Sequence, residues 1–109
     1  MAEAYKVLGQ AALAATTLTD VYTVPGGKSA VVSSIVFANR SATAAVVRAS
    51  IAVAGAADTN KQYIAYDIAL DGNVSIALTL GVTLGAADVV RGRADTANVS
   101  VNVFGTEIT

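Results

Sequence analysis

The sequence of 109 residues contains no histidine, no cysteine and no tryptophan, and only one proline. Without cysteine the chain can form neither a disulfide framework nor a thiolate metal site. Without histidine it lacks the commonest metal ligand and the usual general base near neutral pH. These absences exclude most classes of enzyme, and we expect a noncatalytic protein that uses no cofactor and no metal.

Charged side chains are scarce as well. They make up 14% of the residues, and seven Lys and Arg against eight Asp and Glu give a net charge of −1. A chain with so little net charge produces no long-range field that would attract nucleic acid or an anionic membrane, so neither is an expected partner. Because a typical soluble domain has about 25% charged residues, the low content suggests that another subunit covers part of the surface.

Long hydrophobic runs are also missing. The nearest candidate is interrupted by Arg48, so no segment is apolar enough over about 18 residues to be a membrane helix. The N-terminus lacks the basic leader and apolar core of a signal peptide, and we expect the chain to remain in the cytoplasm of the cell that makes it. A length near 110 favours one domain over residues 1–109.

The sequence is rich in segments with a period of two. Between residues 73 and 80, valine, isoleucine and leucine alternate with smaller or polar residues, which is typical of a half-buried strand. Turn signals such as Pro25-Gly26-Gly27 separate this run from similar ones. About eight short strands are expected, at residues 5–8, 20–24, 30–38, 46–53, 63–70, 73–80, 88–94 and 98–103. This spacing predicts an all-β, single-domain antiparallel β-sandwich that is jelly-roll-like.

The N-terminal segment has weaker signals. We expect Gln10–Ala15 to be a loop or a single turn, because the run is too short for an isolated helix. Residues 1–17 are predicted to include an extended N-terminal arm that orders against a neighbouring subunit. Turns are expected at Gly81 and Gly85.

Four side chains form the candidate partner interface. Arg91 and Arg93 share one face of a strand and could together hold a carboxylate of a partner chain. The alternative is a solvated face whose long stems cover apolar neighbours. Tyr63 and Tyr66 are expected on opposite faces of one strand, which leaves one of them free for contact, and tyrosine is enriched at interface centres. We select Tyr63 together with Tyr5.

Strand and turn patterns along nearly the whole chain carry a family resemblance. They include YKVLGQ at 5–10, TLTDVYTVP at 17–25, VVSSIV at 31–36, KQYIAYD at 61–67, LTLGVTL at 78–84 and FGTEI at 104–108. In these patterns the chain resembles the small β-sandwich virion structural proteins of tailed bacteriophages, including cyanophages. The resemblance implies a noncatalytic capsid decoration (cement) protein or a component of a neck, tail or fibre, with no catalytic residues to carry over.

Among these roles we favour capsid decoration. A small homotrimer that binds the major capsid protein gains affinity from its many copies. A fibre would need repeated or elongated sequence, so a neck or tail attachment component is the alternative. A carbohydrate- or cell-surface-binding module is a further alternative, although sugar binding usually requires exposed tryptophan or paired tyrosines. The expected location is the virion, after assembly in the cytoplasm of the host bacterium.

Overall fold

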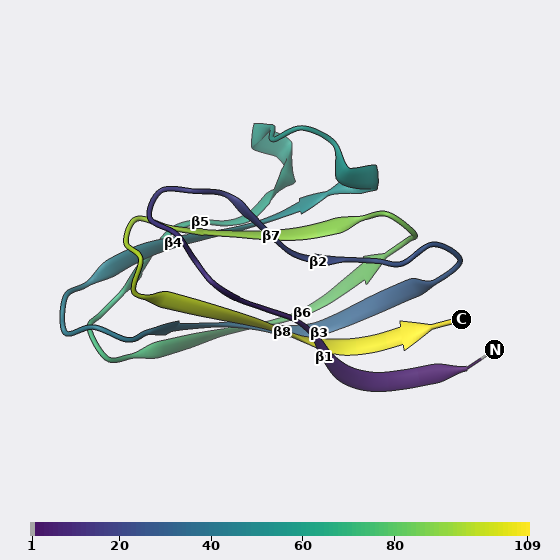
Figure 1. Ribbon diagram of the computed structural model, residues 1–109, viewed down its shortest axis with the longest axis horizontal. Helices are drawn as coiled ribbons and strands as arrows, with labels where there is room; N and C mark the ends of the chain where they lie inside the picture. The colour runs from purple at the N-terminus through teal and green to yellow at the C-terminus, as the bar shows by residue number, and fades with distance from the viewer. Residues whose placement is uncertain (1) are drawn as a thin grey trace.

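The computed structural model describes residues 2–109, and its secondary structure is almost entirely β. The eight strands are β1 Glu3–Ala12, β2 Thr19–Thr23, β3 Ser29–Asn39, β4 Ala45–Ala52, β5 Tyr63–Leu70, β6 Ser75–Leu84, β7 Val89–Ala94 and β8 Val99–Ile108. Two short 3-10 helices, η1 Val53–Gly55 and η2 Asn60–Gln62, lie in the β4–β5 connection, which rises above the sandwich in Figure 1. The prediction of an all-β protein with about eight strands is confirmed.

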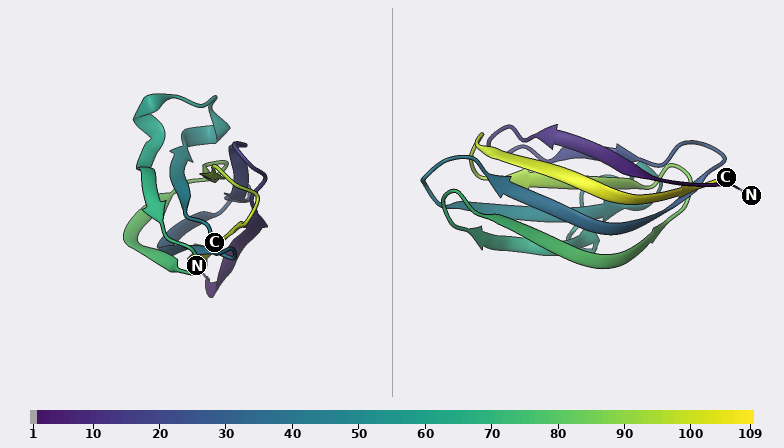
Figure 2. Two further views of the ribbon diagram at one scale, coloured as in Figure 1. Left: turned by 90° about the vertical axis from the view of Figure 1, so that its left-hand side faces the viewer. Right: turned by 90° about the horizontal axis from the view of Figure 1, so that it is seen from below.

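The strands form two four-stranded antiparallel sheets, with the orders β1-β8-β3-β6 and β2-β7-β4-β5 (Figure 1). The right-hand view of Figure 2 looks onto the first sheet and shows its four strands side by side. The pairs β1·β8, β2·β7, β3·β6 and β4·β5 are those of one long antiparallel ribbon that is folded in half and rolled across both sheets. This is the jelly-roll arrangement, so the predicted topology is confirmed.

The core lies between the two sheets and is built mainly of valine and alanine. Phe37, Ile35 and Leu13 are the largest fully buried side chains. Inward positions of β8 and β3 alternate with outward ones, so that Val99, Val101 and Val103 of β8 are buried, as are Val32, Ile35 and Phe37 of β3. β-Branched side chains are stiff and pack well on a pleated surface, which suits them to this thin core.

A line of β-bulges crosses the first sheet and includes Gly81, where the end of a strand was predicted. β1 shifts register between Val7 and Gly9, and β3 shifts between Val32 and Ser34. An extra residue bends a strand and reverses its side-chain alternation. β6 therefore continues through Gly81, where a turn was expected, and ends at Leu84. β8 extends beyond residue 103 to Ile108 without an extra residue of its own.

β1 occupies one edge of the first sheet. The expectation of a loop or turn at Gln10–Ala15 is wrong for residues 10–12, which belong to β1 and pair with β8. A Cβ at Gly9 would lie 2.2 Å from the Val21 carbonyl oxygen, so glycine permits β1 to approach the backbone of the other sheet. Since residues 3–12 pair with β8 of the same chain, an N-terminal arm would require release of this pairing.

Candidate functional site

The outer surface of the β2-β7-β4-β5 sheet carries arginine, tyrosine and aspartate side chains in neighbouring rows. The strand register places Arg48 opposite Arg93, and it places Ser50 between Arg91 and Tyr63. We call this surface the arginine–tyrosine face; its members are Asp20, Arg48, Ser50, Tyr63, Tyr66, Asp67, Arg91 and Arg93.

One half of the arginine–tyrosine face is a chain of stacked and charged groups. The Arg48 guanidinium carbon lies 3.9 Å from the centre of the Tyr66 ring, and its Nε donates to Asp67 Oδ1 at 2.6 Å. The rings of Tyr66 and Tyr63 meet edge to face, with centres 5.1 Å apart. The hydrogen bond from Arg48 lowers the pKa of the Asp67 carboxyl below its ordinary value. The result is a rigid aromatic surface on which the Tyr66 side chain is 56% exposed.

The contact between Tyr63 and Tyr66 corrects the sequence prediction that they lie on opposite faces of β5. β5 shifts register against β4 between Tyr63 and Ala65, and it shifts again near Asp67. The first shift returns Tyr63 to the side of the sheet that Tyr66 occupies. Asp67 adopts a positive φ of 53° at the second shift, a conformation that aspartate tolerates better than most residues.

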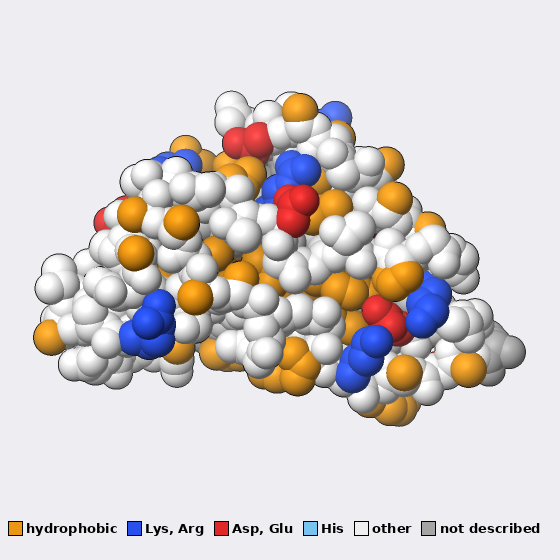
Figure 3. Space-filling model, viewed as in Figure 1, with side chains coloured by type: hydrophobic (Ala, Val, Ile, Leu, Met, Phe, Trp, Pro, Cys, Tyr) orange, Lys and Arg blue, Asp and Glu red, His pale blue; other side chains and the backbone are white. Residues whose placement is uncertain are grey.

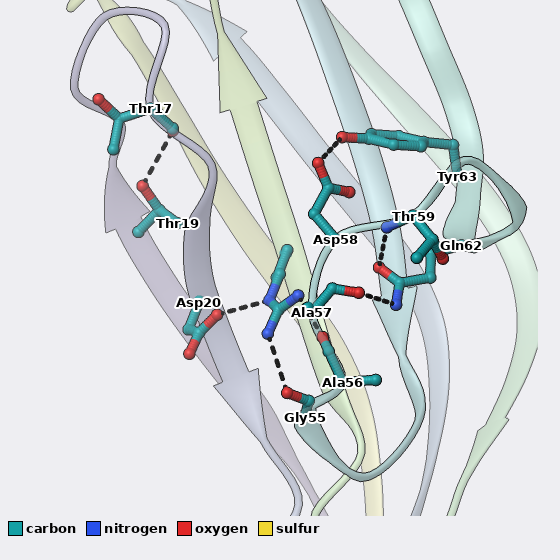
Figure 4. Close-up of polar contacts among 11 residues, drawn as sticks. Thr17, Thr19, Asp20, Gly55, Ala56, Ala57, Asp58, Thr59, Gln62 and Tyr63 are labelled. Carbon is teal, nitrogen blue, oxygen red and sulfur yellow. Dashed lines mark hydrogen bonds and ion pairs between the residues drawn. The ribbon is translucent and has the colours of Figure 1, made fainter.

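The other half of the arginine–tyrosine face is covered by the β4–β5 connection. Arg91 donates from Nε to Asp20 Oδ1 at 2.8 Å, and from Nη1 to the Ala56 carbonyl at 2.8 Å. Figure 4 shows Asp20 of β2 and Gly55 of the connection bound to this guanidinium, and the Tyr63 hydroxyl bound to Asp58 at 3.0 Å. The Arg91 side chain is only 13% exposed, because the connection that it binds lies over it.

Arg93 differs from Arg91 in its partners. It lies on the same outward side of β7, as the sequence predicted. Within residues 2–109 no carboxylate lies at ion-pair distance from Arg93, whereas Arg48 and Arg91 each have one. Arg93 is therefore the one guanidinium of this surface that has no carboxylate partner among the described residues.

The outer surface of the β1-β8-β3-β6 sheet has a different chemistry. The strand register defines four rows of four outward positions. We call these sixteen positions the uncharged face; the rows are Tyr5-Thr106-Val31-Thr83, Val7-Phe104-Ser34-Thr79, Gln10-Asn102-Val36-Ala77 and Ala12-Ser100-Ala38-Ser75. None of the sixteen is Lys, Arg, Asp or Glu. Glu3 lies at the margin and accepts a hydrogen bond from the Tyr5 hydroxyl at 3.1 Å.

A buried carboxylate lies inside the sandwich, behind the uncharged face. Glu107 is 4% exposed and accepts the Tyr22 hydroxyl at 2.8 Å, which joins the two sheets. Lys6 Nζ lies 2.7 Å and Lys28 Nζ 3.6 Å from the Glu107 Oε1 atom. Hydrogen bonds from Lys6 and Tyr22 hold the pKa of Glu107 below its ordinary value, despite the opposing effect of burial. Burial in turn raises the pKa of the Tyr22 hydroxyl.

The four predicted interface residues are divided between the two outer surfaces. Tyr63, Arg91 and Arg93 lie on the arginine–tyrosine face, while Tyr5, at 80% exposure, lies on the uncharged face. The buried cluster of Glu107 with Lys6, Tyr22 and Lys28 was not predicted from the sequence. A signal was present, because Glu107 continues the odd-numbered inward positions of β8 after Val99, Val101 and Val103.

Metal-binding clusters and membrane-spanning helices were both sought among the described residues. No three His, Cys, Asp or Glu residues among 2–109 are grouped so that they could hold a metal ion. No helix in this range is long and apolar enough to span a bilayer.

Comparisons with known proteins identify no family for this chain. No family model matches it, and no curated protein matches it significantly. Two crystal structures of a pentameric capsid protein isolated from metagenomic phage sequences, one of them solved by iodide SAD phasing, align with TM-scores of 0.42 and 0.43 at 21% identity. The alignments cover 95% of this chain but 63% of the other, so the chain spans less than two thirds of their length. At this identity and score the likeness assigns neither a family nor a function.

Proposed function

We propose that the chain is a noncatalytic structural protein of a bacteriophage virion, and that it decorates the capsid by binding the major capsid protein. The observation that carries the proposal is the presence of two outer faces with different chemistry on one jelly roll. A decoration protein must contact both copies of itself and a shell protein, so two unlike surfaces suit it. The resemblance to phage virion proteins along the sequence points to the same role.

The arginine–tyrosine face is the proposed contact with the capsid protein. Tyrosine and arginine are over-represented among the residues that dominate binding energy. Tyr66 offers an exposed ring that Arg48 and Tyr63 hold in place, so little side-chain entropy is lost on binding. Arg93 supplies a guanidinium for a carboxylate of the partner. Of the residues predicted from sequence, Arg93 and Tyr63 keep this role, while Arg91 supports the surface from below.

The remaining parts of the proposal concern copy number and location. The homotrimer expected from the sequence stays a prediction, and the native mass of the chain tests it. Three chains would support the trimer, while an even number would replace it with the two-fold contact inferred below. We place the protein in the virion, assembled in the cytoplasm of the host bacterium. A neck or tail component is the alternative, and it predicts a much smaller copy number.

Quantitative mass spectrometry of purified particles, measured against the major shell protein, tests the proposed function. Decoration predicts a copy number in the hundreds, near one chain per shell subunit. A handful of copies, in multiples of three, six or twelve, would move the protein to the neck or tail. Absence from particles would contradict both virion roles and favour the carbohydrate- or cell-surface-binding module.

A point variant tests the proposed contact surface. Arg93→Glu reverses the charge of the unpaired guanidinium, and we expect it to reduce binding of the purified protein to undecorated particles. Arg40→Glu is the matched control, because Arg40 lies in the β3–β4 loop away from this face. Equal binding of the two variants would contradict the assignment of the arginine–tyrosine face.

A further inference from the structure

We infer that the uncharged face is the surface through which two copies of this chain pack against each other. The inference deepens the self-association included in the proposed function, and it requires no capsid. It follows from the charge, chemistry and size of the sixteen positions defined above.

The absence of charge on this face selects its partner. A charged surface that docked here would lose its water without finding an opposite charge, and that desolvation opposes binding. The arginine–tyrosine face of another copy is such a surface, with three arginines and two aspartates. The uncharged face of a second copy brings no charge to be desolvated. Within this chain, the best match for the uncharged face is therefore itself.

The distribution of side chains supports a two-fold contact. One half of the face presents Tyr5, Val7 and Phe104, and Tyr5 and Val7 are among the exposed large hydrophobic side chains of the molecule. The other half presents neutral amides, and Gln10 Nε2 donates to Asn102 Oδ1 at 2.7 Å. In a two-fold contact the same face of each copy takes part. When the whole face is covered, the apolar half of one copy lies against the neutral amide half of the other, so no apolar side chain meets a charge.

The size of the face is sufficient for such a contact. The sheet runs along the 45 Å axis of the molecule, and the strands are laid side by side along its 19 Å axis (Figures 1 and 2). Stable interfaces bury about 800 Å² on each partner, and since the product of these two molecular extents is an upper bound on the area of the face, the contact must cover nearly all of it. In Figure 3 this sheet forms the lower layer, and hydrophobic side chains are visible along its lower margin.

A substitution at the middle strand of the face tests the inference. Thr106 lies on β8 between Tyr5 and Val31 in one row, so Thr106→Asp places a carboxylate among apolar neighbours. Thr23→Asp is the matched control, because Thr23 is an exposed strand residue of the other sheet. We measure the mass of the full chain, its Thr106→Asp form and its Thr23→Asp form by sedimentation equilibrium, and the fold of each by circular dichroism.

We expect an even number of chains, in place of the homotrimer predicted from the sequence, for the wild type and for Thr23→Asp, and the 10.9 kDa monomer for Thr106→Asp. If Thr106→Asp does not fold, Asn102→Asp takes its place, since it adds the charge without changing shape and keeps the acceptor for Gln10. A folded Thr106→Asp or Asn102→Asp that retains the wild-type mass would overturn the inference, as would a wild type that is monomeric at all concentrations. The copy number in particles is a separate measurement. The proposed function can therefore fail while this inference holds, and this inference can fail while the proposed function holds.

Discussion

The two outer faces of this jelly roll are both built on four-stranded antiparallel sheets, yet they differ in charge. The β2-β7-β4-β5 sheet directs Arg48, Arg91 and Arg93 outward and pairs two of them with aspartates. The β1-β8-β3-β6 sheet directs no charged side chain outward in its four rows, and its buried carboxylate, Glu107, points into the core. Strand alternation decides this difference, because a shift of one residue would exchange the inward and outward sets.

The chain uses its few charged side chains differently on the two sheets. Seven cations and eight anions are available in the chain. The aspartates of the two outward ion pairs are 46% and 61% exposed, so the charge pairing itself contributes little to folding and is available for recognition. The inward pair of Glu107 with Lys6 lies where solvent is excluded from the carboxylate, and it serves the fold instead.

Removal of the inward carboxylate should have the largest effect on stability. Glu107→Ala leaves the buried Tyr22 hydroxyl without its acceptor, which costs about 1–3 kcal/mol of the free energy of unfolding. Chemical denaturation measures the loss. Glu3→Ala is the control, because this exposed carboxylate lies at the margin of the same sheet, and its removal should change stability by at most about 0.5 kcal/mol. Equal losses would contradict the structural role of Glu107.

The same carboxylate should make stability depend on pH. Its pKa is lower in the folded protein than its ordinary value of 4.5. Its contribution is therefore fully present above that value and is lost as the pH falls through the folded-state pKa. We expect the stability difference between the wild type and Glu107→Gln to narrow as unfolding is measured at pH values descending below 4.5. A difference that is constant with pH would show that folding does not lower the pKa of Glu107.

Arg91 and Arg93 of the outer face should differ in their contribution to the free energy of unfolding. Arg91→Ala removes hydrogen bonds to Asp20 and to the Ala56 carbonyl, and we expect a loss of about 1–2 kcal/mol with faster hydrogen exchange in residues 53–62. Arg93→Ala removes no ion pair found within residues 2–109 and should change stability by at most about 0.5 kcal/mol. If Arg93→Ala were the more damaging substitution, the assignment of the two roles would be reversed.

The smallest expected change concerns Ser50. Its hydroxyl is fully buried under the β4–β5 connection, and it has no hydrogen-bond partner among the described residues. A buried hydroxyl without a partner destabilises the fold. Ser50→Ala should therefore leave the melting temperature unchanged or raise it slightly, while the control Ser33→Ala, at an exposed bulge position whose hydroxyl donates to the Phe104 carbonyl, should not raise it. A clear decrease for Ser50→Ala would indicate that the hydroxyl has a partner.

Periodicity predicted the sandwich well, because alternating valine and polar residues leave few alternatives to half-buried strands. It failed where a bulge changes the alternation. Tyr63 and Tyr66 were placed on opposite faces, since no local signal marks the register shift between them. The strand predicted at residues 73–80 was ended before Gly81 because glycine is a turn signal, whereas β6 continues to Leu84. The Glu107 cluster depends on four segments distant in sequence, and only its inward position in β8 was readable beforehand.

Hydroxyl-radical footprinting of the assembled protein tests whether another copy covers the uncharged face and leaves the arginine–tyrosine face accessible. Tyr5 on the uncharged face and Tyr66 on the arginine–tyrosine face are both exposed in the single chain, at 80% and 56%. We expect Tyr5 to be protected in the wild-type assembly while Tyr66 reacts, and both to react in monomeric Thr106→Asp. Equal reactivity of Tyr5 in the assembly and in the monomer would contradict this expectation.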